Sequence, residues 1–380
     1  MRDIYAIRCL NSTFISADPD QQVRMISVSI IVPVHNGGEA FLQCLDSLTR
    51  NASDANEIII VADGETDGVW RQAYASRARI LVNKTSMGPA ASRNRGAEAA
   101  TGDVLLFIDA DVSIQSDTIR LFREAFQVDS GLAAVFGSYD DEPAAKSFLS
   151  RYRNLLHHFT HQRSDKQALT FWCGCGAIRR EVFKNAGGFD DDYTEASVED
   201  IELGYRLTNA GHRIELRRDI QVKHLKKWDA ATMIRTDVFA RAIPWTELIL
   251  SYREMPRDLN LRTENRLSVV LVYGIIVLVL VSIGFPSLLL IAGFLAALFV
   301  VLNLPFYRLL MRKHGVLFTL AAIPWHAFHY FYSGVGFLLG AVRFLGRNLV
   351  SGARVTPAAA NRSSGYPDAT PKATWEDISV

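Results

Sequence analysis

Short apolar runs alternate with helical patterns along the first third of the chain, and this alternation restricts the folds that the chain can adopt. The runs have the length and the aliphatic, β-branched character of buried strands. Predicted strands cover residues 28–34, 57–62, 79–82 and 103–108, and predicted helices cover residues 40–48 and 90–100. Strands that alternate with helices predict an open α/β sheet with a largely parallel core.

Polar residues collect where these predicted strands end. The first strand is followed by Asn36, the second by Asp63, and the fourth by Asp109 and Asp111. Open α/β sheets bind their ligands at the carboxyl ends of the strands. The sequence therefore predicts a ligand site at this edge of the sheet.

The pair Asp109 and Asp111 is the sharpest chemical feature of the sequence. Two carboxylates one residue apart at a strand end can bind one divalent cation, which prefers hard oxygen ligands and bridges diphosphate oxygens. The alternative is an acid pair that caps the loop, because Asp is a common turn residue. The first interpretation implies a metal ion and a diphosphate bound together.

The composition of the chain changes at residue 267. Residues 1–266 mix charged and apolar residues, whereas residues 267–342 are almost free of acids and are rich in Leu, Val, Ile, Phe and Ala. Two apolar runs, 267–283 and 285–304, are each long enough to cross the hydrocarbon core of a bilayer at about 1.5 Å per helical residue. They predict a helical hairpin in the membrane.

Basic residues flank this hairpin and predict its orientation. They are Arg257, Arg262 and Arg266 before the first run, and Arg308, Arg312 and Lys313 after the second. The positive-inside rule then places both flanks, and with them the catalytic domain, on the cytoplasmic side of the inner membrane. A third apolar stretch, 316–342, contains Pro324 and two histidines and has basic residues at both ends. This pattern favours a re-entrant or interfacial segment over a third crossing.

These patterns divide the chain into regions. We expect a disordered N-terminal extension at 1–24, a catalytic domain at 25–250, an amphipathic interfacial linker at 251–266, a membrane region at 267–342 and a disordered tail at 351–380. The 41 basic and 40 acidic residues leave a net charge of +1, which argues against a nucleic-acid partner. The few, irregularly spaced cysteines indicate a reducing compartment rather than a disulfide framework.

Several motifs, in order along residues 28–230, resemble those of glycosyltransferase family 2. Residues 29–36 resemble the family's first nucleotide-binding strand, 60–67 its VDDGSTD segment, 88–94 its GxxxARN helix start and 109–111 its metal motif. Residues 171–176 resemble its glycine loop beside the donor sugar, 198–200 its acidic motif and His224 its late metal-binding histidine. The resemblance rests on the order of the motifs as well as on each motif.

The resemblance implies a GT-A fold, which is the Rossmann-like open mixed sheet of nucleotide-diphospho-sugar transferases, followed here by C-terminal membrane helices. It also implies a metal-dependent inverting glycosyltransferase, hexosyltransferase-like, that uses Mn²⁺ or Mg²⁺ and a nucleotide-sugar donor. A membrane anchor confines the active site to the layer where lipid substrates are concentrated. We therefore expect a bilayer-associated acceptor, such as a polyprenyl phosphate or a lipid-linked glycan.

The resemblance further implies a role for each candidate residue, with Asp200 as the catalytic base. Contacts with the acceptor or the donor sugar are expected from Glu199, Trp172, Gly174 and Gly176, and nucleotide contacts from Pro33, His35, Asn36, Asp63, Arg93 and Asp109. Lys226, Lys227 and Trp228 are expected at the diphosphate, and Asp109, Asp111 and His224 at the metal. The residue types alone leave other roles open, because acids at a helix start complement the helix dipole and glycines serve ordinary turns.

The sequence departs from the family pattern in two places. Ala62 stands where the family has the first acid of its pair, so contacts with the nucleobase fall on Asp63 and the choice between uracil and guanine stays open. Residues 224–228 fit poorly to the Gln-x-x-Arg-Trp signature of processive synthases, which favours single sugar transfer. A processive polysaccharide synthase and a catalytically inactive membrane scaffold with the same fold are the alternatives.

Overall fold

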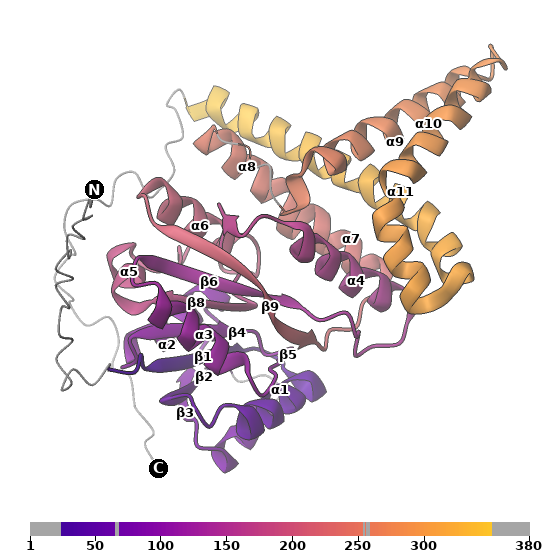
Figure 1. Cartoon of the computed structure of the whole chain (residues 1–380). Helices are drawn as coiled ribbons and strands as arrows, with labels where there is room; N and C mark the ends of the chain where they lie inside the picture. The colour runs from indigo at the N-terminus through magenta and orange to yellow at the C-terminus, as the bar shows by residue number, and fades with distance from the viewer. Residues whose placement is uncertain (1–23, 65–67, 254, 256–258, 352–380) are drawn as a thin grey trace, which may run out of the picture.

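The structure is a computed structural model that describes residues 24–64, 68–253, 255 and 259–351. Residues 1–23, 65–67 and 352–380 lie outside it, and with them nearly all of the predicted extension and tail and the end of the 60–67 motif. Figure 1 shows a sheet domain in the first two thirds of the chain and a group of long helices at the C-terminal end.

A mixed sheet forms the centre of the first domain. Its strands are β1 (Val28–Val34), β2 (Glu57–Asp63), β3 (Arg79–Asn83), β4 (Val104–Ile108), β5 (Val112–Ser113), β6 (Leu132–Tyr139), β7 (Gln167–Ala168), β8 (Cys175–Arg179) and β9 (Arg213–His224). Their order is β3-β2-β1-β4-β8-β6-β9-β5, with β7 paired to β9. All four predicted strands are present, and each lies within one residue of its predicted bounds.

The direction of the strands changes at β8. Strands β1 to β4 are mutually parallel, which confirms the predicted parallel core. Strand β8 runs antiparallel to both β4 and β6, and β9 then pairs in parallel with β6. This change of direction brings the start of β8 beside the end of β4, so the glycine-rich segment before β8 lies next to Asp109.

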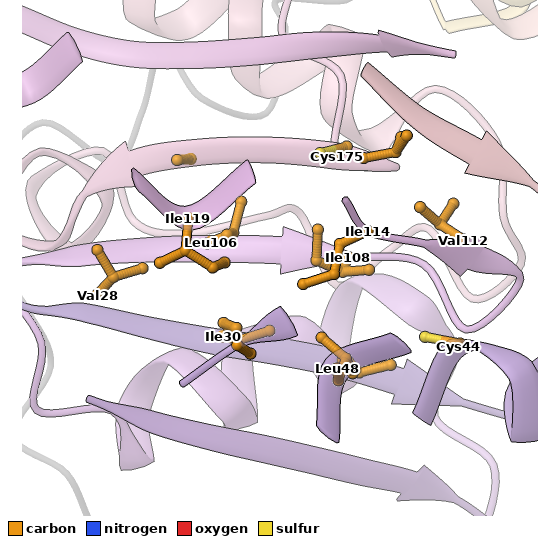
Figure 2. Packing of buried hydrophobic residues seen from close by; sticks show 14 of the residues in the cluster. Val28, Ile30, Cys44, Leu48, Leu106, Ile108, Val112, Ile114, Ile119 and Cys175 are labelled. Carbon is orange, nitrogen blue, oxygen red and sulfur yellow. The ribbon is translucent and has the colours of Figure 1, made fainter. Parts of the chain in front are cut away.

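Helices cover both faces of the sheet (Figure 1). They are α1 (Gly38–Asn51), α2 (Pro89–Ala99), α3 (Thr118–Val128), α4 (Phe148–Arg163), α5 (Arg180–Asn185) and α6 (Glu199–Asn209), with a 3₁₀ segment η1 (Val69–Ala75). Because side chains alternate along a strand, Leu106 and Ile108 of β4 enter the core on one face and Leu105 and Phe107 enter the core on the other. Figure 2 shows Cys44 and Leu48 of α1 meeting the strands in the first of these cores.

The remaining helices form the C-terminal group. They are α7 (Ala230–Arg235), a π-helical segment η2 (Thr236–Ala242), α8 (Ile243–Tyr252), a 3₁₀ turn η3 (Leu259–Leu261), α9 (Thr263–Val281), α10 (Leu288–Leu302) and α11 (Leu304–Ser351). Helices α9 and α10 lie side by side and extend away from the sheet domain, whereas α11 runs back across it along α8 (Figure 1). The predicted hairpin is therefore present as a helix pair.

Length and composition make one described helix, Thr263–Val281, able to cross a membrane. A second candidate is the pair Leu288–Leu302 and Leu304–Leu349, which meet at an angle of 64°. The third apolar stretch, 316–342, lies within α11, whose backbone breaks from helical geometry at Gly315. Part of this stretch packs on the first helices of the C-terminal group, since Tyr332 forms one hydrophobic cluster with Val238 of η2 and Ile243 of α8.

Candidate active site

A cleft of about 1050 Å³ opens at the carboxyl ends of β1, β2 and β4, where the polar strand ends were predicted to meet. Among its lining residues are Pro33, His35, Asn36, Asp63, Arg93, Asp109, Asp111, Lys226 and Lys227. The other predicted site residues, Trp172, Gly174, Gly176, Glu199, Asp200, His224 and Trp228, are not part of this lining. Most of them contact the lining residues from behind, as the following contacts show.

The short pairing of β5 with β9 brings two of the three predicted metal-binding residues, Asp111 and His224, together. Val112 is paired with His224 in this ladder, and the carbonyl of Asp111 accepts a hydrogen bond of 2.8 Å from the backbone of Leu225. As a result, Nε2 of His224 lies 3.6 Å from Oδ2 of Asp111. Burial alone would raise the pKa of Asp111, but the hydrogen bond and charge of His224 lower it below its ordinary value.

Asp109 is held by two other parts of the chain. Its backbone N–H donates to the carbonyl of Gly174 over 3.2 Å, and its Oδ1 accepts from Nη2 of Arg93 over 2.7 Å. Arg93 is only 4% exposed, and its Nη1 donates to Oε1 of Glu199 over 2.9 Å. The Arg93 guanidinium therefore ties the metal motif to the acidic motif and is largely occupied inside the protein.

The donor atoms at this end of the cleft suit a divalent cation. Asp109 and Asp111 offer carboxylate oxygens, which Mn²⁺ and Mg²⁺ prefer, and His224 offers an imidazole nitrogen, a ligand more typical of transition metals than of Mg²⁺. Within the described residues, no three His, Cys, Asp or Glu side chains are grouped closely enough to enclose a metal ion. Asp109 is paired with Arg93, with 2.7 Å between Oδ1 and Nη2.

The Asp63 carboxylate, predicted to contact the nucleobase, is hydrogen-bonded to other residues of the protein. Its Oδ1 accepts from Asn83 Nδ2 at 2.9 Å and from the backbone of Met87 at 2.7 Å. Its Oδ2 accepts from Ser86 Oγ and the backbone of Gly88, both at 2.9 Å. Burial alone would raise the pKa of Asp63, but these four hydrogen bonds lower it. The carboxylate therefore shapes the loop before α2, and contact with a nucleobase stays a prediction.

Asp200, the predicted catalytic base, lies in the first turn of α6. Its Oδ2 accepts hydrogen bonds from the backbone N–H of Cys173 at 3.1 Å and from Sγ of the same residue at 3.4 Å. Burial and the neighbouring charge of Glu199 raise the pKa of Asp200 to about 6. Its Oδ1 also caps the helix by accepting from the Ile201 N–H, so the capping role is present as well. A carboxylate with a pKa near neutrality is suited to accepting a proton.

The glycines of the 171–176 segment are required by the protein's own packing. A Cβ at Gly174 would lie 2.6 Å from the Trp172 ring, and a Cβ at Gly176 would lie 2.2 Å from the Trp172 carbonyl. The Trp172 ring in turn packs edge-on against Tyr139 and His161. The close approach that the sequence indicated is therefore to Trp172 and its neighbours, and a role at the sugar stays a prediction.

The segment after β9 presents its lysines to the cleft and buries its tryptophan. Lys226 and Lys227 line the cleft, and Nζ of Lys226 lies 4.5 Å from the centre of the Trp228 ring. Trp228 is 5% exposed, and its backbone N–H donates to Ser150 Oγ over 2.8 Å. Trp228 thus packs against Lys226 and is not part of the cleft lining, and its contact with the diphosphate stays a prediction.

Sequence reasoning missed the segment that faces the loop before α2. Thr194, Glu195 and Ala196 line the cleft opposite that loop. Gly88 has a φ of +90°, and a Cβ there would lie 2.3 Å from the carbonyl oxygen of Thr194. The dipeptide Gly88-Pro89 before a helix indicates that another segment packs closely against the backbone there. That segment lies more than 100 positions away in the chain, and the sequence did not identify it.

Comparison with known proteins agrees with this arrangement. Residues 29–187 match the model of the family described as Glycosyl transferase family 2. This segment of the chain is therefore similar to a family 2 glycosyltransferase domain. Together with the open mixed sheet, this match confirms the predicted fold class, a GT-A type α/β domain followed by apolar C-terminal helices.

The family 2 domain has curated relatives that match over part of their length. A validoxylamine A glucosyltransferase of Streptomyces hygroscopicus subsp. jinggangensis (strain 5008) is 27% identical over 257 residues, which are 57% of this chain and 61% of that protein. The uncharacterized glycosyltransferase YibD of Escherichia coli (strain K12) is 40% identical over 88 residues, 22% of this chain and 26% of the relative. The chain thus spans about a quarter to three fifths of these relatives.

Among solved structures, the chain is similar to the mannosyltransferase PcManGT from Pyrobaculum calidifontis in complex with GDP-Man and Mn²⁺. The TM-score is 0.49 at 18% sequence identity, and the alignment covers 84% of this chain and 87% of that one. It is also similar to S. aureus TarS 1–349 in complex with UDP-GlcNAc, with a TM-score of 0.44 at 18% identity, covering 59% of this chain and 64% of that one.

Proposed function

We propose that this protein is a metal-dependent inverting glycosyltransferase that moves a sugar from a nucleotide-diphosphate sugar to a membrane-associated acceptor. The observation that carries the proposal is a chain of contacts from the metal motif to the acidic motif. Asp109 pairs with Arg93, Arg93 pairs with Glu199, and Asp200 follows Glu199 at the start of α6. Arg93 therefore links Asp109, which lines the cleft, to Glu199, an acid 90 positions further along the chain that lies behind the lining.

Residues in the cleft and directly behind its lining are assigned to different parts of sugar transfer. Asp109, Asp111 and His224 would hold Mn²⁺ or Mg²⁺, which supplies positive charge to a departing nucleoside diphosphate. Lys226 and Lys227 add positive charge on the same side of the cleft. Pro33, His35 and Asn36 at the end of β1 and the loop shaped by Asp63 form the wall assigned to the nucleotide.

Asp200 is the proposed base of the transfer step. As the acceptor oxygen bonds to the anomeric carbon, the bond between that carbon and the diphosphate oxygen breaks. The proton of the acceptor hydroxyl passes to the Asp200 carboxylate, and the nucleoside diphosphate leaves with the bonding electrons. Attack from the side opposite the leaving group inverts the anomeric centre.

The helices after the domain support an acceptor at the membrane. Helix α9 is long and apolar enough to span a bilayer, and basic residues precede it. By the positive-inside rule we place the sheet domain on the cytoplasmic face of the inner membrane, where a polyprenyl phosphate or lipid-linked glycan is within reach. The name of the glucosyltransferase relative supports sugar transfer without identifying this acceptor.

A donor screen tests the proposal directly. The full chain in detergent is offered UDP- and GDP-sugars with Mn²⁺ or Mg²⁺, with and without membrane lipids, and release of nucleoside diphosphate is measured. We expect turnover with one donor class, and we expect Asp111→Ala to lower it about 100-fold, as losing a group that stabilises developing charge typically does. Asp117→Ala, which changes an exposed acid at the start of α3, is the matched control.

The alternatives give different results in the same system. An inactive scaffold would release no nucleoside diphosphate and would show no metal-dependent nucleotide binding by calorimetry, and this outcome would overturn the proposal. A processive synthase would add many sugars to one acceptor molecule, whereas we expect one sugar per acceptor.

A further inference from the structure

A second cavity, of about 560 Å³, lies outside the nucleotide cleft. Its walls come from the sheet domain through α4, from η2 and α8, and from the apolar helices α9 and α11. It therefore lies at the junction between the transferase domain and the helices that are candidates for the membrane. Neither the predicted site residues nor the transfer step described above uses it.

One side of this cavity is suited to a hydrocarbon chain. Val269 and Tyr273 of α9, Phe306 near the start of α11, and Phe337 and Leu338 further along α11 line it. Buried apolar surface of this kind gains about 25 cal/mol per Å² when a hydrocarbon displaces water from it. These apolar wall residues belong to α9 and α11, the helices that contain candidate membrane spans.

The remaining walls carry a surplus of positive charge. The charged lining residues are Arg153, Arg163, Arg241, Arg262, Arg266, Asp237 and Glu264, which are five arginines and two carboxylates. Arg153 and Arg241 both pair with Asp237, and Asp237 is 6% exposed. Because one carboxylate cannot neutralise two guanidinium groups, this corner of the cavity favours an anionic ligand.

Three nearly buried polar atoms on the cavity wall have no hydrogen-bond partner within the described residues. They are Nε of Arg153, Nε1 of Trp245 and Nε2 of His326, on side chains of residues that are 4%, 8% and 1% exposed. Buried polar groups are normally satisfied, and leaving one unsatisfied costs about 1–3 kcal/mol. The three side chains belong to three different helices, α4, α8 and α11, and all three residues line this cavity.

A series of contacts through η2 and α4 links the wall of the cavity to residues of the transfer site. Nη1 of Arg241 lies 3.4 Å from Nε2 of His157, whose ring stacks on Tyr139, which in turn stacks on His224 at 4.2 Å. On the other side, Ser197 Oγ donates to the Ala240 carbonyl of η2 over 3.0 Å, two residues before Glu199. Single-turn π-helical segments such as η2 occur frequently at functional sites.

We propose that this cavity binds the acceptor as a lipid, with a phosphate group at Arg153 and Arg241 and the hydrocarbon chain between α9 and α11. The assignment rests on the proposed transferase function and names the chemical class of its acceptor. The phosphate then lies beside the residues that lead to His224 and Asp200, and the tail extends toward the helices that are apolar enough to span a membrane. In the group transfer, an oxygen of the lipid phosphate bonds to the anomeric carbon while the bond from that carbon to the donor diphosphate breaks. The nucleoside diphosphate leaves with the bonding electrons, and in the protonated form of the phosphate its proton passes to the Asp200 carboxylate.

Binding of farnesyl phosphate to the full chain in detergent, measured by calorimetry, tests the proposal. We expect farnesyl phosphate to bind and to change the rate of nucleoside diphosphate release. Farnesol should bind about 10- to 150-fold more weakly, because it lacks the charged group that hydrogen-bonds to the arginines. Inorganic phosphate, which lacks the tail, is expected not to bind measurably. Arg241→Gln should weaken farnesyl phosphate by a similar factor, and Val269→Phe, which fills the tail side, should weaken farnesyl phosphate and farnesol alike.

The control variant is Arg120→Gln, which changes an exposed arginine paired with Glu124 on α3. Metal-dependent nucleotide binding, measured on every variant, reports that the nucleotide cleft is folded. Equal affinity of the wild type and Arg241→Gln for farnesyl phosphate would overturn the proposal, as would binding that leaves donor turnover unchanged. If the proposed transferase function is wrong, the result differs: nucleotide binding is missing while farnesyl phosphate still binds.

Discussion

At the scale of single residues, several of the predicted site residues are hydrogen-bonded to other residues of the protein. Arg93 is held by Asp109 and Glu199, and Asp63 is held by its own loop. Asp200 differs from these residues, because its carboxylate is bonded to Cys173 and has no cationic partner at ion-pairing distance among the described residues. Its raised pKa is the property expected of a proton acceptor.

The pKa of about 6 for Asp200 predicts the pH dependence of transfer. A base works only when it is deprotonated, so kcat/KM should fall about tenfold per pH unit below about pH 6 and stay level above it. Cys173→Ala removes a hydrogen bond to the charged form, so the acid limb should move to higher pH. The measurement is the pH profile of nucleoside diphosphate release.

Cys175→Ala is the matched control, since Cys175 is also a buried free cysteine and makes no hydrogen bond to Asp200. It should leave the position of the acid limb unchanged. An identical acid limb in Cys173→Ala and the wild type would contradict the assignment of Asp200.

At the scale of elements, the cleft depends on turns that hold strand ends and helix starts together. Gly88, immediately before α2, has a positive φ, and its Cα faces the carbonyl of Thr194. The N–H of Gly88 donates to Asp63 at the end of β2. This one residue therefore links β2, α2 and the segment 194–196 at the mouth of the cleft.

Gly88→Ala should destabilise the fold and weaken nucleotide binding. The side chain meets both an unfavourable φ, costing about 1–3 kcal/mol, and a backbone carbonyl at 2.3 Å. We expect a lower Tm in thermal unfolding of the full chain and a higher Kd for the nucleotide. In Gly187→Ala the φ is also positive, at +81°, but nothing lies within 4 Å of the new Cβ, so this variant measures the cost of φ alone. Equal losses in the two variants would show that the contact with Thr194 is unimportant.

At the scale of the whole molecule, a buried ionic cluster joins the transferase domain to the C-terminal helices. Asp237 of η2 accepts from Nη1 of Arg153 on α4 at 3.0 Å and from the hydroxyl of Tyr332 on α11 at 2.9 Å. It also pairs with Arg241. Three elements from different parts of the chain therefore meet at one carboxylate, which lies on the wall of the proposed lipid cavity.

Asp237→Asn should loosen this junction. Removing one partner of a buried ionic cluster leaves uncompensated charge and costs about 3–5 kcal/mol. We expect a lower Tm and faster proteolytic cleavage between the sheet domain and α11. Asp219→Asn, which breaks an exposed pair with Arg217, should cost at most about 1 kcal/mol. Comparable effects of the two substitutions would argue against a structural role for the cluster.

Features that depend on neighbouring residues in the sequence were predictable, whereas contacts between distant segments of the sequence were not. Strand bounds near Val28, Glu57 and Asp109 followed from local patterns, and the motif order led to the right family. The partners of Asp63, Trp172 and Trp228 were not predictable, because their hydrogen bonds and ring contacts join segments far apart in the sequence.

The sequence by itself determined the sheet domain, the acids at its strand ends and the apolar character of residues 267–342, because alternation, strand-end chemistry and hydropathy are properties of neighbouring residues. Only the tertiary structure decided which acids remain available to a ligand and which are bonded to the protein. It also created the arginine-lined cavity, since Arg153, Arg241 and the walls of α9 and α11 meet only after the helices pack on the domain. Packing is a long-range property, and no local pattern records it.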